Sequence, residues 1–170
     1  NIFKQSLILA ILFKLSLEAD RDLLVNVAAM LFILPFFLFS ALGGQFGEKF
    51  AKDLLIRRLK FFEIFIMGAG AAGVLLGSLT LMLALLFTMG IQSALFGPVK
   101  YSILPQALKP EELVGGNALV EMGTFLAILA GTIGAGIMLT SADYGLIVAI
   151  SVVAVAVLGY LAARGIPAAA

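Results

Sequence analysis

Two charged side chains, Lys100 and Glu121, interrupt stretches of sequence that are otherwise apolar. An ionised group in apolar surroundings is costly unless an opposite charge or hydrogen bonds compensate it. The pair could line a cavity and bind a charged ligand, or form a structural salt bridge, or Lys100 could extend to a polar boundary. Asn117, one helical turn before Glu121, would share its face. Gln92 is a weaker candidate for the same site, the alternative being a hydrogen bond between helices.

Catalytic and cofactor motifs receive little support. The sequence contains no histidine and no cysteine, which excludes a Ser-His-Asp triad and His- or thiolate-ligated metal from this chain. GAGAAG at residues 68–73 fits the dinucleotide fingerprint G-x-G-x-x-G, but that motif requires a preceding strand and here it lies inside a long apolar stretch. We therefore predict no catalytic residue, no cofactor and no metal ion.

The composition indicates that a lipid bilayer surrounds most of the chain. Hydrophobic residues make up 62% of it and charged residues 12%, whereas soluble domains carry about 25% charged residues. Too little polar surface remains to cover a water-soluble globule. The net charge of +1 gives no general attraction to nucleic acid, so we predict no nucleic-acid partner.

The apolar segments predict an all-α, polytopic membrane protein with six transmembrane helices. A transmembrane helix needs roughly 20 mostly apolar residues. The first segment is short, and we interpret it as the outer part of a helix whose beginning is missing. The predicted segments are 1–16, 23–42, 61–76, 79–101, 118–140 and 144–163.

Basic residues predict the orientation of these helices, because short cytoplasmic loops retain Lys and Arg. If the N-terminal side of the first helix is inside, the inner side receives Lys49, Lys52, Arg57, Arg58, Lys60, Lys100, Lys109 and Arg164, against Lys14 and Arg21 outside. The segment 43–60 is thus predicted to be a cytoplasmic loop. Phe46, Phe50 and Leu54 recur every four residues, so part of it could form a short helix in the membrane interface.

Small residues at four-residue spacing predict close helix packing. Ala69, Gly73 and Gly77 form one such stripe, and Gly131 lies in the middle of a second, from Ala127 to Ala135. Small residues let two membrane helices approach each other closely. We expect these stripes to be packing faces.

The order of residues in the basic segment resembles a known signature. From Gly44 the chain reads G-Q-F-G-E-K-F-A-K-D, similar to the loop signature of the major facilitator superfamily, although Ala51 replaces a glycine and Asp53 a base. In that superfamily the acid and the bases form charge contacts that close the cytoplasmic gate. The resemblance implies this role for four residues: Gly44, Glu48, Lys49 and Lys52.

A narrower resemblance comes from GPVKYSILPQ at 97–106, LVGGNALVEMGTFLAILAGT at 113–132 and the start NIFKQSL. Together these resemble the bacterial lysophospholipid transporter branch of the superfamily, which includes forms fused to a 2-acylglycerophosphoethanolamine acyltransferase. The resemblance covers nearly the whole chain and implies that residues 1–170 are the N-terminal six-helix half of a twelve-helix transporter. It also implies that Asn1 lines the cavity.

What this resemblance implies is movement of lysophospholipid across the bacterial inner membrane by alternating access. Lys100 would pair with a lipid phosphate, and Glu121 with an amine or with Lys100. The implied partners are membrane lipids, the substrate, the C-terminal half and a fused or partner acyltransferase. Two alternatives stay open: an exporter of drugs or other small solutes, and a non-transporting membrane platform for an acyltransferase.

Overall fold

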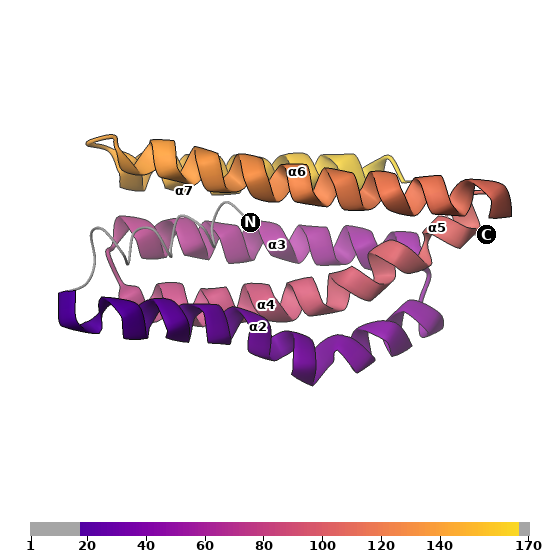
Figure 1. Cartoon of the computed structure of the whole chain (residues 1–170), viewed down its shortest axis with the longest axis horizontal. Helices are drawn as coiled ribbons and strands as arrows, with labels where there is room; N and C mark the ends of the chain where they lie inside the picture. The colour runs from indigo at the N-terminus through magenta and orange to yellow at the C-terminus, as the bar shows by residue number, and fades with distance from the viewer. Residues whose placement is uncertain (1–17, 167–170) are drawn as a thin grey trace.

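The computed structural model describes residues 18–166, and these residues fold into helices without any strand (Figure 1). Five helices are long: α2 (Glu18–Lys49), α3 (Lys52–Leu75), α4 (Leu79–Ser102), α6 (Leu113–Leu139) and α7 (Tyr144–Arg164). Two short ones, α5 (Leu104–Ala107) and η2 (Pro110–Glu112), join α4 to α6. The all-α prediction is confirmed for this part of the chain. The predicted first helix lies outside the described residues, so the number six stays a prediction.

Four helical stretches of the described chain are long and apolar enough to cross a membrane. They are Asp22–Lys49, Leu79–Ala107, Pro110–Leu139 and Tyr144–Arg164. Helix α3 is of similar length, 24 residues, but its first half carries charged side chains, among them Arg58, Lys60 and Glu63. Helix α3 is not among the four candidate spans, so the predicted transmembrane segment 61–76 stays a prediction.

The predicted loop at 43–60 is wrong as a loop. Helix α2 continues to Lys49 and α3 begins at Lys52, so the two helices are joined through Phe50 and Ala51. The predicted short interfacial helix is also wrong, because Phe46 belongs to α2 and Leu54 to α3. Charge alone does not end a helix, since Lys, Arg and Glu are good helix formers. The compartment of this segment stays a prediction.

Helices α2 and α4 approach each other closely through glycine. A Cβ on Gly90 would lie 2.6 Å from the carbonyl oxygen of Phe32 and 2.9 Å from Cγ of Pro35. A Cβ on Gly43 would lie 2.9 Å from the carbonyl oxygen of Ala94. Pro35 removes a backbone donor inside α2, and the helix bends in its middle part (Figure 1).

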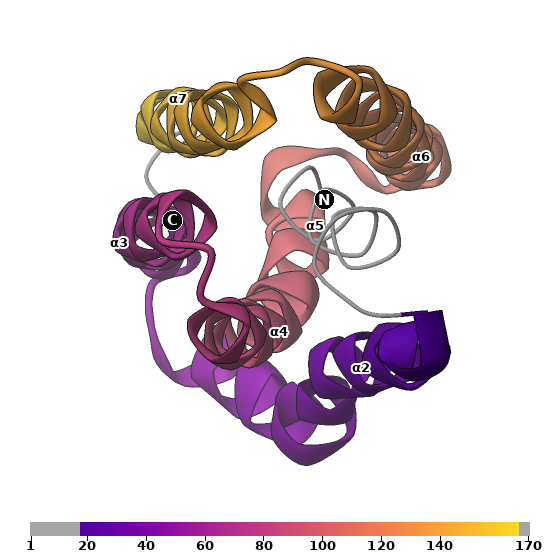
Figure 2. The same cartoon turned by 90° about the vertical axis from the view of Figure 1, so that its left-hand side faces the viewer.

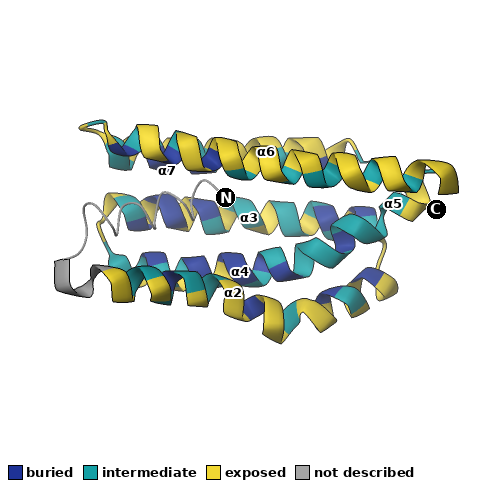
Figure 3. Cartoon of the chain, in the orientation of Figure 1, coloured by how far each residue is buried: buried dark blue, intermediate teal, exposed yellow. Residues whose placement is uncertain are grey.

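The helices form an arc around the middle of the bundle when viewed from one end (Figure 2). Helix α3 packs between α4 and α7, and α2 packs along α4 on the other side. Buried residues lie mainly where one helix faces another (Figure 3), and many large apolar residues are exposed, among them Phe37, Phe65 and Phe125. The main core cluster consists of Ala28, Met67, Ala71, Met82, Leu86, Met89, Val148, Ala149, Val152 and Ala156. An apolar exterior around a packed interior suits a protein in lipid.

The stripe of small residues in α3 is shorter than predicted. Gly73 is buried, and a Cβ there would lie 3.2 Å from Cγ of Met82 on α4. Ala69 is exposed. Gly77 lies beyond the helix with a φ of 62° and has open space around it, so its predicted packing role is wrong. Gly131 is buried within α6.

The role of Gly77 is to end α3. Its N–H donates to the carbonyl of Val74, and the N–H of Ser78 donates to the carbonyl of Gly73. These two bonds around a left-handed residue form a Schellman motif, which satisfies carbonyls that the helix end leaves free. Ser78 then caps α4, its hydroxyl accepting from the N–H of Leu81. The turn between α3 and α4 is thus set by local chemistry.

Candidate functional site

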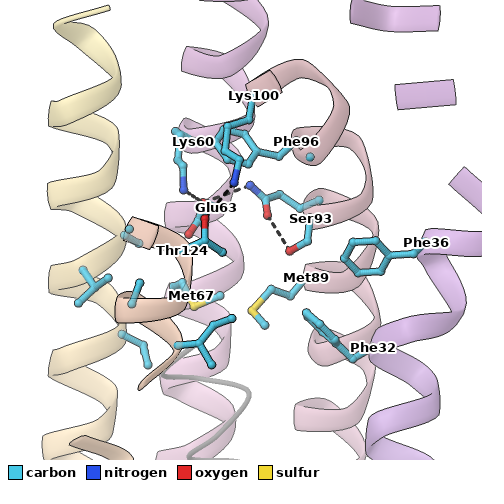
Figure 4. Close-up of a pocket in the computed structure, with 18 of the residues that line it drawn as sticks. Phe32, Phe36, Lys60, Glu63, Met67, Met89, Ser93, Phe96, Lys100 and Thr124 are labelled. Atoms are coloured by element: carbon cyan, nitrogen blue, oxygen red, sulfur yellow. Dashed lines mark hydrogen bonds and ion pairs between the residues drawn. The ribbon is translucent and has the colours of Figure 1, made fainter. Parts of the chain in front are cut away.

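A cavity of about 650 Å³ lies within the arc of helices, with residues from α2, α3, α4, α6 and α7 in its wall (Figure 4). One part of the wall is apolar and includes Phe32, Phe36, Met67, Met89, Ile128 and Val152. The other part is polar and includes Lys60, Glu63, Gln92, Ser93, Lys100 and Thr124. The cavity therefore offers charged groups of both signs beside an apolar surface.

Glu63 is the centre of the polar wall. Its Oε2 lies 2.7 Å from Nζ of Lys60, one turn earlier in α3, and accepts a hydrogen bond of 3.1 Å from Nε2 of Gln92 on α4. Lys60 also lies over the ring of Phe96, with Nζ 4.7 Å from its centroid. The spacing of three residues places Lys60 and Glu63 on one helix face. This cluster holds a cation and an anion at the surface of the cavity.

Lys100 provides a second cation in the same wall. Its Nζ donates to Oγ1 of Thr124 on α6 at 3.1 Å and lies 4.5 Å from the ring centroid of Tyr101. Thr124 in turn donates to the carbonyl of Val120 in its own helix. Within residues 22–166 no carboxylate forms an ion pair with Lys100. Lys100 is therefore available to an anionic ligand group.

The structure does not bring Lys100 and Glu121 into an ion pair. The Oε1 of Glu121 accepts a short hydrogen bond from the hydroxyl of Tyr101, which links α6 to α4 at the end of the latter. Glu121 does not belong to the described lining of the cavity, although it follows Val120, which does. Adjacent residues on a helix point about 100° apart, and this separates the two side chains.

The other predicted site residues differ in whether they line the cavity. Gln92 is buried, lines the cavity and bonds to Glu63, so the alternative of an interhelical hydrogen bond is confirmed. Asn117 is exposed, and its amide donates to the carbonyl of Leu113 in its own helix. Asn1 lies outside the described residues.

The segment with the gate signature lies at the junction of α2 and α3. Glu48 and Lys49 are exposed, and Lys52 is partly so. Gly44 has open space around it, whereas a Cβ on Gly47 would lie 3.5 Å from Oγ of Ser102 on α4. Glu48, Lys49 and Lys52 form no ion pair with any residue between 22 and 166. Their gating role stays a prediction.

Asp53, where the signature usually has a base, is buried. Its Oδ2 lies 3.9 Å from Nη2 of Arg57, one turn later, and the same nitrogen donates a 2.7 Å hydrogen bond to the carbonyl of Ile166, just after α7. The departure from the signature thus has a structural role: the start of α3 is attached to the end of α7.

Lys60 and Glu63 are the site residues that sequence reasoning missed. The two side chains form an ion pair at a spacing of three residues, and both line the cavity. The available signal was the conjunction of a charged pair at i and i+3 with Gln92 in the neighbouring apolar segment. Intramembrane polar residues on adjacent helices usually face each other.

The chain is 33% identical over 159 residues to a lysophospholipid transporter of Salmonella schwarzengrund, and 32% identical over 159 residues to those of Salmonella newport and Salmonella heidelberg. This chain is similar to bacterial lysophospholipid transporters. The matched region is 94% of this chain and 38% of each relative, so the chain spans well under half of their length. No family model and no solved structure matches it.

The similarity to transporters and the apolar helices both indicate a membrane protein. Four helical stretches of the described chain are long and apolar enough to cross a membrane, and the relatives are named lysophospholipid transporters. The chain is therefore a multi-pass membrane protein. The cavity wall carries charges of both signs at Lys60, Glu63 and Lys100.

Proposed function

We propose that this chain is the N-terminal six-helix half of a major facilitator transporter that moves lysophospholipid across the bacterial inner membrane by alternating access. The observation that carries the proposal is the cavity, in which two lysines and a glutamate lie beside an apolar wall. The similarity to lysophospholipid transporters over 94% of the chain supports the same substrate class.

The chemistry of the cavity suits a lysophospholipid with an amine in its head group. Such a molecule carries a phosphate, an ammonium and one acyl chain. Lys100, whose described partner is a neutral hydroxyl, would bind the phosphate, and Glu63 would accept the ammonium beside Lys60. Charge-assisted hydrogen bonds of this kind are about twice as strong as neutral ones. The acyl chain would lie against Phe32 and Phe36.

The second half of the proposed transporter would cover the open side of the cavity. In major facilitator proteins two bundles rock against each other around a site near the midplane of the bilayer. The charged gate residues Glu48, Lys49 and Lys52 would then contact that second half, which is consistent with their lack of ion-pair partners among the described residues. An acyltransferase, fused or separate, would consume the delivered lipid.

The proposal is tested by uptake into proteoliposomes that contain the full-length protein. Radiolabelled lysophosphatidylethanolamine should be moved across the membrane, and unlabelled substrate should compete. Glycerophosphoethanolamine, which has the head group without the acyl chain, should compete poorly because it leaves the apolar wall unfilled. Competition by unrelated cationic drugs but not by the lysolipid would instead support the exporter. If the folded full-length protein moves no lipid at all, the result would support the non-transporting platform.

A further inference from the structure

A second hollow lies away from the cavity, where the end of α2 and the start of α3 meet α4. Its volume is about 280 Å³. We call it the junction groove, and its lining consists of Phe46, Phe50, Ala51, Leu54, Leu55, Arg58, Leu59 and Leu95. The rings of Phe46 and Phe50 lie 6.0 Å apart. Every lining residue except Arg58 is apolar, so the junction groove is an apolar surface with one positive charge.

Arg58 differs from the basic residues next to it. Arg57 bonds to Asp53 and to the carbonyl of Ile166, and Lys60 pairs with Glu63. Arg58 is exposed and has no hydrogen-bond or ion-pair partner among residues 22–166. A guanidinium group is always charged, and its planar geometry allows bidentate hydrogen bonding to a phosphate. Because Arg58 is charged and has no partner among these residues, it can bind an anion from outside the described chain.

The basic residues around the junction groove predict that it lies near a membrane boundary. The turn at Phe50 and Ala51 joins two helices that continue into apolar segments, and Lys49 and Lys52 flank it. From Ala51 to Leu59 the helical wall extends about 12 Å, at 1.5 Å per residue. Phe50 and Leu54 are half exposed at its mouth. The groove therefore offers the positive charge of Arg58 beside an apolar wall.

We propose that the junction groove binds an anionic membrane phospholipid, one acyl chain lying along the apolar wall and the phosphate paired with Arg58. Basic pockets between membrane helices on the cytoplasmic side are suited to anionic head groups. The aromatic rings of Phe46 and Phe50 supply the apolar contact, and Lys49 and Lys52 raise the local positive potential. This lipid is a bound component of the protein and not its transported substrate, and the site does not depend on what the large cavity carries.

The proposal is tested by native mass spectrometry of the full-length protein released from nanodiscs of phosphatidylethanolamine and phosphatidylglycerol. Two variants alter the groove in independent ways: Arg58→Gln removes the charge, and Ala51→Trp fills the hollow without changing charge. Arg58→Gln should reduce retained phosphatidylglycerol by about fivefold, because a basic group near anionic lipid contributes about 1 kcal/mol. Ala51→Trp should reduce it as well, because the indole occupies the space of the acyl chain. Retention of phosphatidylethanolamine should not change.

Arg164→Gln is the matched control, since it removes an exposed arginine at the end of α7 that does not line the groove. It should retain phosphatidylglycerol as the wild type does. The proposal is overturned if Arg58→Gln and Ala51→Trp retain as much phosphatidylglycerol as the wild type, or if Arg164→Gln loses the same amount. Unfolding curves in detergent show whether a variant is folded. If Ala51→Trp does not fold, Leu95→Phe provides the groove-filling arm.

Discussion

Gln92 of α4 donates a 3.1 Å hydrogen bond to Glu63 of α3, a residue 29 positions earlier in the sequence. The same carboxylate oxygen lies 2.7 Å from the ammonium group of Lys60. One oxygen thereby holds a cation in the cavity wall and connects two helices. Its removal should affect both the packing of the bundle and the cavity.

Glu63→Gln should destabilise the protein, because the ammonium of Lys60 would lose its counter-charge in a partly buried position. A hydrogen bond to a charged group contributes about 1.5–3 kcal/mol, and partial exposure places the expected loss at the lower end. Thermal unfolding of the full-length protein in detergent measures it. The double variant Lys60→Met with Glu63→Gln should recover part of the loss. A double variant no more stable than the single one would contradict the explanation.

Lys100→Gln should reduce uptake of lysophosphatidylethanolamine by about tenfold at equal expression, because a charge-assisted bond to phosphate is lost. Asn117→Ala should transport almost normally, since that amide is exposed and bonds to its own helix. Lys109→Gln is the matched control for charge, because Lys109 is exposed outside the cavity. Equal losses in the variants at 100 and 109 would show that net charge, not the cavity, governs uptake.

Gly90→Ala should destabilise the bundle by about 1–3 kcal/mol, the usual cost of overpacking. The new methyl group would lie 2.6 Å from the carbonyl oxygen of Phe32, and this backbone atom cannot move freely. Gly97→Ala in the same helix meets nothing within 4 Å and should be neutral or slightly stabilising. Unfolding temperatures of the two variants, measured side by side, check the expected order, and the reverse order would refute the close α2–α4 contact.

Gly77→Ala should cost about 1–2 kcal/mol, because its φ of 62° lies in the left-handed region that side chains disfavour. Gly68→Ala within α3 has open space and a helical backbone, so it should not destabilise. Thermal unfolding in detergent compares them. Equal stability of the two variants would contradict the Schellman termination of α3.

The two ends of the bundle should lie in opposite compartments. The α2–α3 junction and the α6–α7 turn are at opposite ends of the long axis (Figure 1). The chain has no cysteine, so Lys52→Cys and Asp143→Cys each give a single label here. A membrane-impermeant maleimide applied to intact cells should react at 143 alone, and at 52 after permeabilisation. Reaction at both positions in intact cells would refute the predicted orientation.

The helices were largely predictable because their apolar lengths are a local property of the sequence. The stretch from Tyr144 and the stretch from Leu79 begin at the predicted residues. The segment 43–60 was misjudged because its charges predict a boundary of the membrane, whereas helical backbone continues through it. Hydropathy reports the solvent of a residue and not the conformation of its backbone.

The site was less predictable because it depends on how helices are rotated about their axes. The Lys60–Glu63 pair follows from spacing within one helix, whereas the contact of Glu63 with Gln92 requires the mutual rotation of α3 and α4. In the same way, the rotation of α6 relative to α4 directs Glu121 to Tyr101 instead of Lys100. A single sequence fixes which residues share a helix face, but the neighbour that this face meets is a property of the whole fold.

The glycine contacts between α2 and α4 have a mechanical consequence. Where backbone touches backbone at two levels, at Gly90 and at Gly43, neither helix can shift along the other without collisions at both. The two helices should therefore move together as one rigid body. Helix α6 meets α4 through the side-chain bonds Lys100–Thr124 and Tyr101–Glu121, which exchange partners far more readily than packed backbone. We therefore expect the cavity to widen by movement of α6 relative to a fixed α2–α4 pair.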